Sequence, residues 1–125
     1  MDTDFYMIFT VSIIINASIM VVYVIPRYEG IIEFFMTDSI KSGVLKEAQK
    51  IIATANEIAS GYGVSIKTEI LEGHIEEKII ETANKLKNNL IVMGTYGWRG
   101  INKAIMGSTT ERIIINATCP VLVVR

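Results

Sequence analysis

One stretch of the chain, from Leu90 to Thr110, constrains the fold more than any other. Its first four residues, Leu90-Ile91-Val92-Met93, predict a buried strand that ends at Gly94, and a second glycine follows at Gly97. After nine intervening residues, Gly107 precedes Ser108-Thr109-Thr110, which predict the start of a helix. The stretch therefore predicts a strand, a loop and a helix start, with a glycine at each joint.

The chemistry of this stretch favours a phosphate ligand. Gly94 and Gly97 can adopt positive φ and let a ligand lie against bare backbone. Gly107 leaves the helix N-terminus open, where unpaired N–H groups and the helix dipole attract an anion. The three following hydroxyls can add donors, and the loop's only charges, Arg99 and Lys103, are positive. Because glycines are also common punctuation, an empty or vestigial site is the alternative.

The spacing also carries a family resemblance. Other phosphate loops do not fit, because the chain has neither a Walker pattern nor a Gly-x-Gly-x-x-Gly fingerprint. One spacing pattern resembles the nucleotide-binding signature of the universal stress protein family, in its ATP-binding branch. The pattern is Gly94, two residues, Gly97, nine residues, and then Gly107 and Ser108. Asn89 to Gly94 is similar to that family's fourth strand, and Asn116 to Val124 to its closing strand. The resemblance implies an adenine nucleotide α-hydrolase-like fold.

Length and composition bound the remaining possibilities. At 125 residues, 1–125 is expected to be one domain, and a net charge of −1 gives no basic footprint for nucleic acid. A single cysteine, Cys119, excludes an internal disulfide and suits a reducing compartment, so we expect a cytoplasmic protein. Cys119 is expected to be a small buried apolar residue. With His74 as the only histidine, no ordinary zinc site and no metal ligand set are expected.

The N-terminus permits two interpretations. Residues 5–25 carry no charge, and this uncharged segment is long enough for a membrane-spanning helix. Polar residues within this segment and its richness in valine and isoleucine favour buried sheet, so a membrane segment is not expected. Asp2 and Asp4 stand where a secretory signal would carry Lys or Arg.

Residues 18–25 form an unbroken apolar run closed by Pro26, which is typical of a parallel strand covered on both faces. This run resembles the family's second strand, and the resemblance implies that Val24 lies against the adenine. Thr3-Asp4-Phe5 is similar to the end of the family's first strand. Too few residues precede Ser18 for a first strand and helix of normal length. We therefore expect either that the first βα unit is shortened or atypical, or that the chain is a truncated version.

The middle of the chain alternates helices and strands. Residues 27–43 are expected to be a loop with one helical turn, followed by an amphipathic helix at 44–60 and a half-exposed strand at 64–70. A second helix is expected at 75–87, with Leu86 among its inward residues and glutamates paired with lysines on its solvated face. A last helix is expected at 108–117, with Ile113-Ile114-Ile115 packed on the sheet and Arg112 in solvent. Pro120 to Arg125 is expected to be the closing strand.

These elements predict a single α/β domain with a mostly parallel twisted sheet and helices on both faces. The closing strand has no charge or bulge to protect its edge, and both this feature and the resemblance imply a homodimer joined through Pro120 to Arg125.

The expected function is that of an ATP-binding universal stress protein, a nucleotide-dependent binding or regulatory module with little or no turnover and no catalytic residues. Any Mg²⁺ would be bound through the phosphates. Met93 and Gly94 would line the base and ribose, Gly97 the ribose, and Gly107, Ser108, Thr109 and Thr110 the phosphates. Two alternatives remain open: a slow ATP-hydrolysing or phosphotransfer enzyme, and a structural dimer with a non-functional pocket. The sequence does not decide between ATP, ADP and AMP, and it names no physiological partner.

Overall fold

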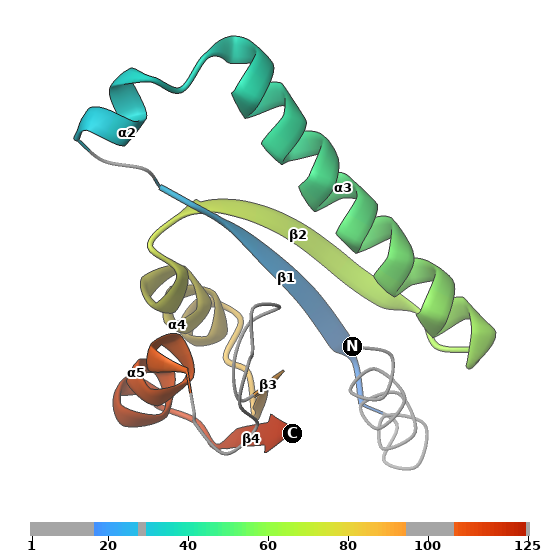
Figure 1. The fold of residues 1–125 in the computed structure, drawn as a ribbon. Helices are drawn as coiled ribbons and strands as arrows, with labels where there is room; N and C mark the ends of the chain where they lie inside the picture. The colour runs from blue at the N-terminus through green and yellow to red at the C-terminus, as the bar shows by residue number, and fades with distance from the viewer. Residues whose placement is uncertain (1–16, 28–29, 95–106, 125) are drawn as a thin grey trace. The chain divides into compact units, whose positions relative to one another are not determined.

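The computed structural model describes residues 17–27, 30–94 and 107–124. Strands and helices alternate along these residues (Figure 1). Contacts divide the chain into two compact units, residues 1–74 and residues 75–125, and each unit is described by itself. The first holds β1, α2, α3 and β2, and the second holds α4, β3, α5 and β4.

The first unit contains a two-stranded parallel sheet. β1 spans Ile19–Pro26 and pairs along its whole length with β2, Ile66–Gly73. The amide of Arg27 extends the pairing by donating to the Gly73 carbonyl at 3.1 Å. The predicted strand at 18–25 is confirmed, whereas β2 begins and ends later than the predicted 64–70.

The helix of the first unit is longer than the sequence pattern predicted. α3 spans Asp38–Gly61, so the prediction that it begins at residue 44 was wrong. Thr37 caps it, and its Oγ1 accepts a hydrogen bond from the Ile40 amide at 3.2 Å. Gly43, which was predicted to lie in the loop, is inside the helix. The expected single turn before this helix is confirmed as α2, Ile31–Phe34.

α3 contacts both strands of its sheet through one face. The buried residues of this face recur at intervals of four, three and four residues, as an amphipathic helix requires: Ala48, Ile52, Ala55 and Ala59. Gly63, with φ of 68°, follows the helix, and the Val64 amide donates back to the Ala59 carbonyl at 2.9 Å. The helix was predicted to end at residue 60, and it ends one residue later, at Gly61.

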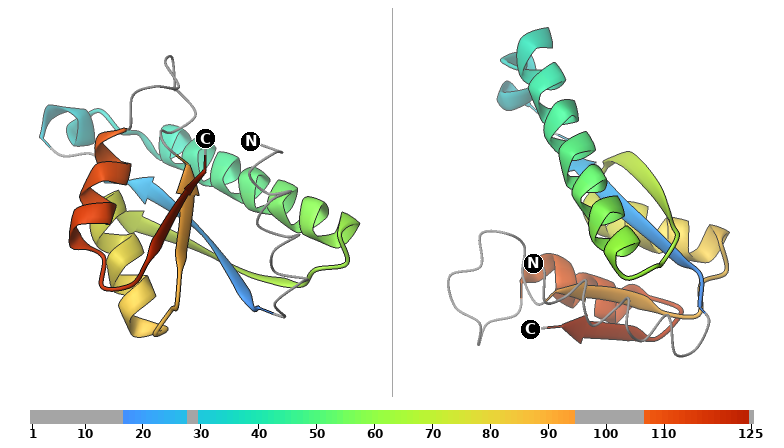
Figure 2. Two further views of the ribbon diagram at one scale, coloured as in Figure 1. Left: turned by 90° about the horizontal axis from the view of Figure 1, so that it is seen from below. Right: turned by 90° about the vertical axis from the view of Figure 1, so that its right-hand side faces the viewer.

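The second unit contains a second parallel pair. β3, Ile91–Gly94, pairs with β4, Val121–Val124, and the two strands lie side by side in both views of Figure 2. The helices are α4, Ile75–Lys85, and α5, Ser108–Asn116. One buried residue each from α4, β3 and α5 forms the core of this unit: Ala83, Ile91 and Ile113. The predicted alternation of helix and strand is confirmed here.

Two predictions about burial in the second unit were wrong in part. Only Ile113 of the three consecutive isoleucines is fully buried, while Ile114 and Ile115 are 41% and 71% exposed. Successive residues of a helix point about 100° apart, so three neighbours cannot all face the core. Leu86, which was expected to point inward, lies beyond the end of α4 and is 47% exposed.

The expected α/β class with parallel strands is confirmed, since every strand pair among residues 17–27, 30–94 and 107–124 is parallel. These residues form two two-stranded sheets. Within the same ranges, no helix is long and apolar enough to cross a membrane. The interpretations that concern Asp2, Asp4 and the first βα unit fall on residues 1–16, outside the described part of the chain.

Candidate functional site

The predicted anion site is centred on the first turn of α5. Gly107 is the N-cap of this helix, with φ of −66° and ψ of 151°, and no side chain caps the turn. The first intrahelical bond runs from the Glu111 amide to the Gly107 carbonyl at 3.0 Å. The amides of residues 108–110 precede this bond, so the helix itself gives them no acceptor. This turn can therefore offer N–H groups to an anion.

Backbone conformation is not the reason for glycine at either described position of the signature. Gly94 is a regular strand residue in register with Val124, and the described glycines with positive φ are Gly30, Gly63 and Gly73. The conformation of Gly107 is one that any residue can adopt. What Gly107 lacks is a side chain that could accept a hydrogen bond from the first turn of α5.

The three hydroxyl residues of this turn have different surroundings. Ser108 is exposed and Thr109 is partly buried, whereas Thr110 is only 3% exposed. The Thr110 hydroxyl donates to the Gly94 carbonyl at 2.8 Å. A hydroxyl has one hydrogen to donate, so this bond uses the donor that was expected to reach a phosphate. The side chain of Thr110 thus joins the start of α5 to the end of β3.

The residues expected near the base and ribose lie in both units. Met93 is partly buried and packs against the core of the second unit formed by Ala83, Ile91 and Ile113. Val24 is 8% exposed in β1 of the first unit. Gly97, with the loop charges Arg99 and Lys103, lies outside the described residues.

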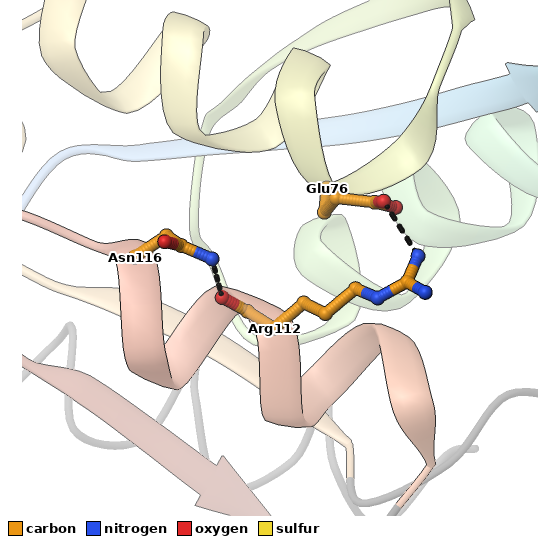
Figure 3. A network of polar contacts seen from close by, with 3 residues as sticks. All are labelled: Glu76, Arg112 and Asn116. Atoms are coloured by element: carbon orange, nitrogen blue, oxygen red, sulfur yellow. Dashed lines mark hydrogen bonds and ion pairs between the residues drawn. The ribbon is translucent and has the colours of Figure 1, made fainter.

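A polar network links α4 to α5, and the sequence did not reveal it. Arg112 Nη1 forms an ion pair with Glu76 Oε1 at 2.9 Å, and Asn116 Nδ2 donates to the Arg112 carbonyl at 2.9 Å (Figure 3). Arg112 had been expected to face solvent, and its side chain is indeed 64% exposed while it forms this pair. The two partners are 36 residues apart in the chain, so no helical spacing could have predicted them.

This network borders a surface groove between the same two helices. Residues of both helices line the groove: Glu76, Glu77, Ile80, Glu81, Asn84, Arg112 and Asn116. Lys78 pairs with Glu81 at 3.6 Å, so the expected pairing of glutamates with lysines on α4 is found at a spacing of three residues. The lining itself carries three glutamates and one arginine, so the groove is net acidic even with Lys78 paired beside it.

The next feature is the placement of side chains that could bind a metal ion in the described ranges. Within them, no three His, Cys, Asp or Glu side chains gather closely enough to hold a metal ion. His74 is exposed just before α4 begins. Cys119 is a free thiol that packs, partly buried, against the core of the second unit.

Parallel strands connected through helices, with a helix N-terminus that lacks a side-chain cap beside the end of β3, define the class of the protein as α/β. Solved universal stress proteins that align with it have the adenine nucleotide α-hydrolase-like fold. Residues 15–125 match the model of the universal stress protein family. The chain belongs to that family. The resemblance seen in the sequence is thereby confirmed.

Two relatives show how much of the chain is shared. A universal stress protein of Methanocaldococcus jannaschii is 46% identical over 80 residues, which cover 64% of this chain and 47% of the relative. A universal stress protein of Bacillus subtilis is 35% identical over 88 residues, which cover 70% of this chain and 60% of the relative. The chain thus spans about half of the length of these curated relatives.

Solved structures share the fold. A second universal stress protein of M. jannaschii aligns with a TM-score of 0.71 and 27% identity, covering 86% of this chain and 74% of its own. A universal stress protein of Archaeoglobus fulgidus, solved in complex with dAMP, aligns with a TM-score of 0.74 at 17% identity, covering 99% of this chain and 86% of its own. A further universal stress protein was solved in complex with cAMP.

Proposed function

We propose that this chain binds ATP and acts in the cytoplasm as a nucleotide-dependent binding or regulatory module with little or no turnover. The amides at the start of α5, with Gly107, Ser108 and Thr109, hold the phosphates, while Met93, Gly94 and Gly97 lie along the ribose and base. Val24 contacts the adenine, and Mg²⁺ enters only as a partner of the phosphates.

Family membership supports an adenine nucleotide as the ligand, because two relatives of the same fold were solved with dAMP and with cAMP. Both ligands carry a phosphate, which suits a site made of backbone N–H groups. Hydrogen bonds to a charged partner contribute about 1.5–3 kcal/mol each. Three or four such bonds would be enough for binding near the micromolar range, at about 8 kcal/mol, before ordering costs are subtracted.

One observation carries the proposal: Gly107 is an N-cap without a capping side chain. Ser, Thr, Asp and Asn are the residues preferred at this position because their side chains accept hydrogen bonds from the first turn. A glycine there forgoes this stabilisation and leaves the same N–H groups available to a ligand. The arrangement suits a helix whose cap is the bound phosphate.

The sharpest test replaces Gly107 with aspartate. In Gly107→Asp the carboxylate occupies the first-turn amides and repels a phosphate, so we expect ATP affinity to fall more than about tenfold. The fold is preserved, because an aspartate cap stabilises a helix and the backbone conformation suits any residue. Isothermal titration calorimetry with ATP measures the affinity, and thermal melting measures the stability.

Thr37→Asp is the matched control. It introduces the same carboxylate at the N-cap of α3, in the first unit, and should leave ATP affinity unchanged. A wild-type protein that releases no heat with millimolar ATP would contradict the proposal and favour the structural dimer. Equal ATP affinities of the wild type and Gly107→Asp would place the phosphates elsewhere.

A hydrolysis assay with Mg²⁺ distinguishes a binding module from a slow enzyme. Catalysis of phosphoryl transfer needs a positioned base or metal ligands beside the phosphates, and the loop offers only Arg99, Lys103 and hydroxyls. We expect no steady turnover above the uncatalysed rate. Turnover that disappears in Arg99→Ala or Lys103→Ala would identify an enzyme instead.

The proposed assembly is a homodimer joined through the closing strand, from Pro120 to Arg125. Within the described ranges β4 pairs with β3 alone, and a second copy would pair with its other edge. An apolar edge strand without charges is a template for such pairing.

A further inference from the structure

The second unit contains one buried polar side chain whose role the phosphate chemistry does not explain. Thr110 is 3% exposed, and it is the one polar residue classed as buried within residues 17–27, 30–94 and 107–124. Burying a hydroxyl is unfavourable unless it is hydrogen-bonded. Its partner is the Gly94 carbonyl at 2.8 Å, so the burial is compensated by one specific contact.

This contact joins two points that are far apart in the chain. Gly94 is the last residue of β3, and Thr110 lies in the first turn of α5, sixteen residues later. Residues 95–106, between them, lie outside the described part of the chain. Whatever path these residues follow, the hydrogen bond holds the end of the strand and the start of the helix together.

The hydrogen bond between Thr110 and Gly94 sets the separation between the end of β3 and the start of α5, on which nucleotide binding depends. In the proposed function, Met93 and Gly94 lie along the base and ribose, and the first turn of α5 holds the phosphates. A single nucleotide can satisfy both parts only if the strand end and the helix start keep a set separation. Holding that separation before the ligand arrives reduces the ordering cost of binding.

We propose that Thr110 is a positioning residue for the nucleotide, acting through Gly94 and the α5 backbone rather than by donating its hydroxyl to a phosphate. This inference rests on the proposed function. Ile113 is the other buried residue of α5, so packing and one hydrogen bond together set the orientation of the helix. Ser108 and Thr109, which are exposed or partly buried, supply the side-chain donors.

The test removes the hydroxyl and keeps the shape. Thr110→Val replaces the hydroxyl with a methyl group and leaves the Gly94 carbonyl without its donor, so ATP affinity should fall about tenfold. Thr110→Ser keeps the donor and should stay within about threefold of the wild type. Titration with adenosine gives the second readout: because adenosine has no phosphate, Thr110→Val should weaken it less than ATP.

Thr118→Val is the matched control for the loss of a threonine hydrogen bond. Thr118 Oγ1 bonds to Asn84 Oδ1 on α4, outside the proposed nucleotide contacts, so this variant should leave ATP affinity unchanged. Thermal melting of every variant shows that the titrations are made on folded protein. If Thr110→Val does not fold, Thr110→Ser is compared with Thr110→Ala, and the serine variant should bind ATP several-fold more tightly.

Each outcome separates the two proposals. A wild-type protein that does not bind ATP overturns the proposed function itself. A wild type that binds ATP, with a folded Thr110→Val that binds equally well, overturns the positioning role alone. Failure of Thr110→Ser to restore affinity also overturns it, because the hydroxyl is then not the relevant group. An equal loss of affinity for ATP and for adenosine also overturns it, because the effect of the contact would then not depend on the phosphates.

Discussion

At the scale of single residues, burial separates the three consecutive isoleucines of α5. Ile113 is fully buried in the core of the second unit, where it meets Ala83 and Ile91. Ile115, two residues later, is 71% exposed. Two isoleucines of one helix therefore lie in different environments. The same substitution at both positions measures how much burial contributes to stability.

Ile113→Ala should destabilise the protein by about 2–5 kcal/mol, because it removes buried methyl groups and leaves a cavity beside the core. Ile115→Ala should change stability by less than about 0.5 kcal/mol, since that side chain is mostly in water. Urea denaturation followed by circular dichroism measures both values. Similar losses in the two variants would contradict the orientation of α5.

The ion pair between Glu76 and Arg112 should contribute little to stability despite its short distance. The two side chains are 26% and 64% exposed, so water and salt screen the attraction. A double-mutant cycle with Glu76→Gln and Arg112→Gln should give a coupling energy of about 0.2–1 kcal/mol that decreases at high salt. A coupling that is much larger and independent of salt would show that this network is a main support of the second unit.

At the scale of elements, two glycines beside or within α3 have opposite requirements. Gly43 lies inside the helix, and a Cβ there would meet nothing within 4 Å. Gly63 follows the helix with φ of 68°, a conformation that side chains other than glycine rarely adopt. Space is equally available at both positions, so backbone conformation alone distinguishes them.

Gly43→Ala should therefore stabilise the protein by about 0.4–1 kcal/mol, because alanine loses less conformational entropy in a helix. Gly63→Ala should destabilise it by about 1–2 kcal/mol, because it strains a left-handed residue. Chemical denaturation of the two variants beside the wild type gives both differences. Destabilisation by Gly43→Ala would mean that the helix does not begin at Asp38.

Comparison of the predicted and observed elements shows which of their bounds the sequence patterns could predict. Helices with a sustained apolar period and strands of unbroken apolar residues were predicted, and the end of α3 was predicted to within one residue. The start of α3 was missed because Gly43 interrupts the local pattern, although Thr37 followed by Asp38 is a typical cap. The first ten residues of α3 are exposed apart from the partly buried Val44, so the Thr37 cap rather than packing on the strands supports this end of the helix.

The candidate site was predictable to a similar degree. The open N-terminus at Gly107 follows from local sequence, and the structure has the helix where the spacing predicted it. The hydrogen bond of Thr110 to Gly94 was not predictable, because a hydroxyl after an N-cap can equally point to solvent, ligand or backbone. Only the packing of α5 beside the end of β3 decides among these.

At the scale of the whole molecule, each unit carries its own two-stranded parallel sheet within the described residues. Parallel strands are usually found in larger sheets whose faces are both covered. In the second unit, β4 has Val124 at 5% exposure while Leu122 is 41% exposed. An exposed leucine on a strand with one partner among the described residues is the kind of surface that pairing with another copy would cover.

We therefore expect a dimer in solution and expect Leu122→Asp to weaken it. A carboxylate on the edge strand would be desolvated by pairing, and a leucine contact worth about 1.5–3 kcal/mol would be lost, which corresponds to at least about a tenfold weaker association. Leu86→Asp is the matched control, since Leu86 is similarly exposed at 47% but lies after α4, away from the closing strand. Size-exclusion chromatography with light scattering over a range of concentrations measures the assembly. Dissociation in Leu86→Asp as well, or a wild type that stays monomeric at high concentration, would exclude the closing strand as the interface.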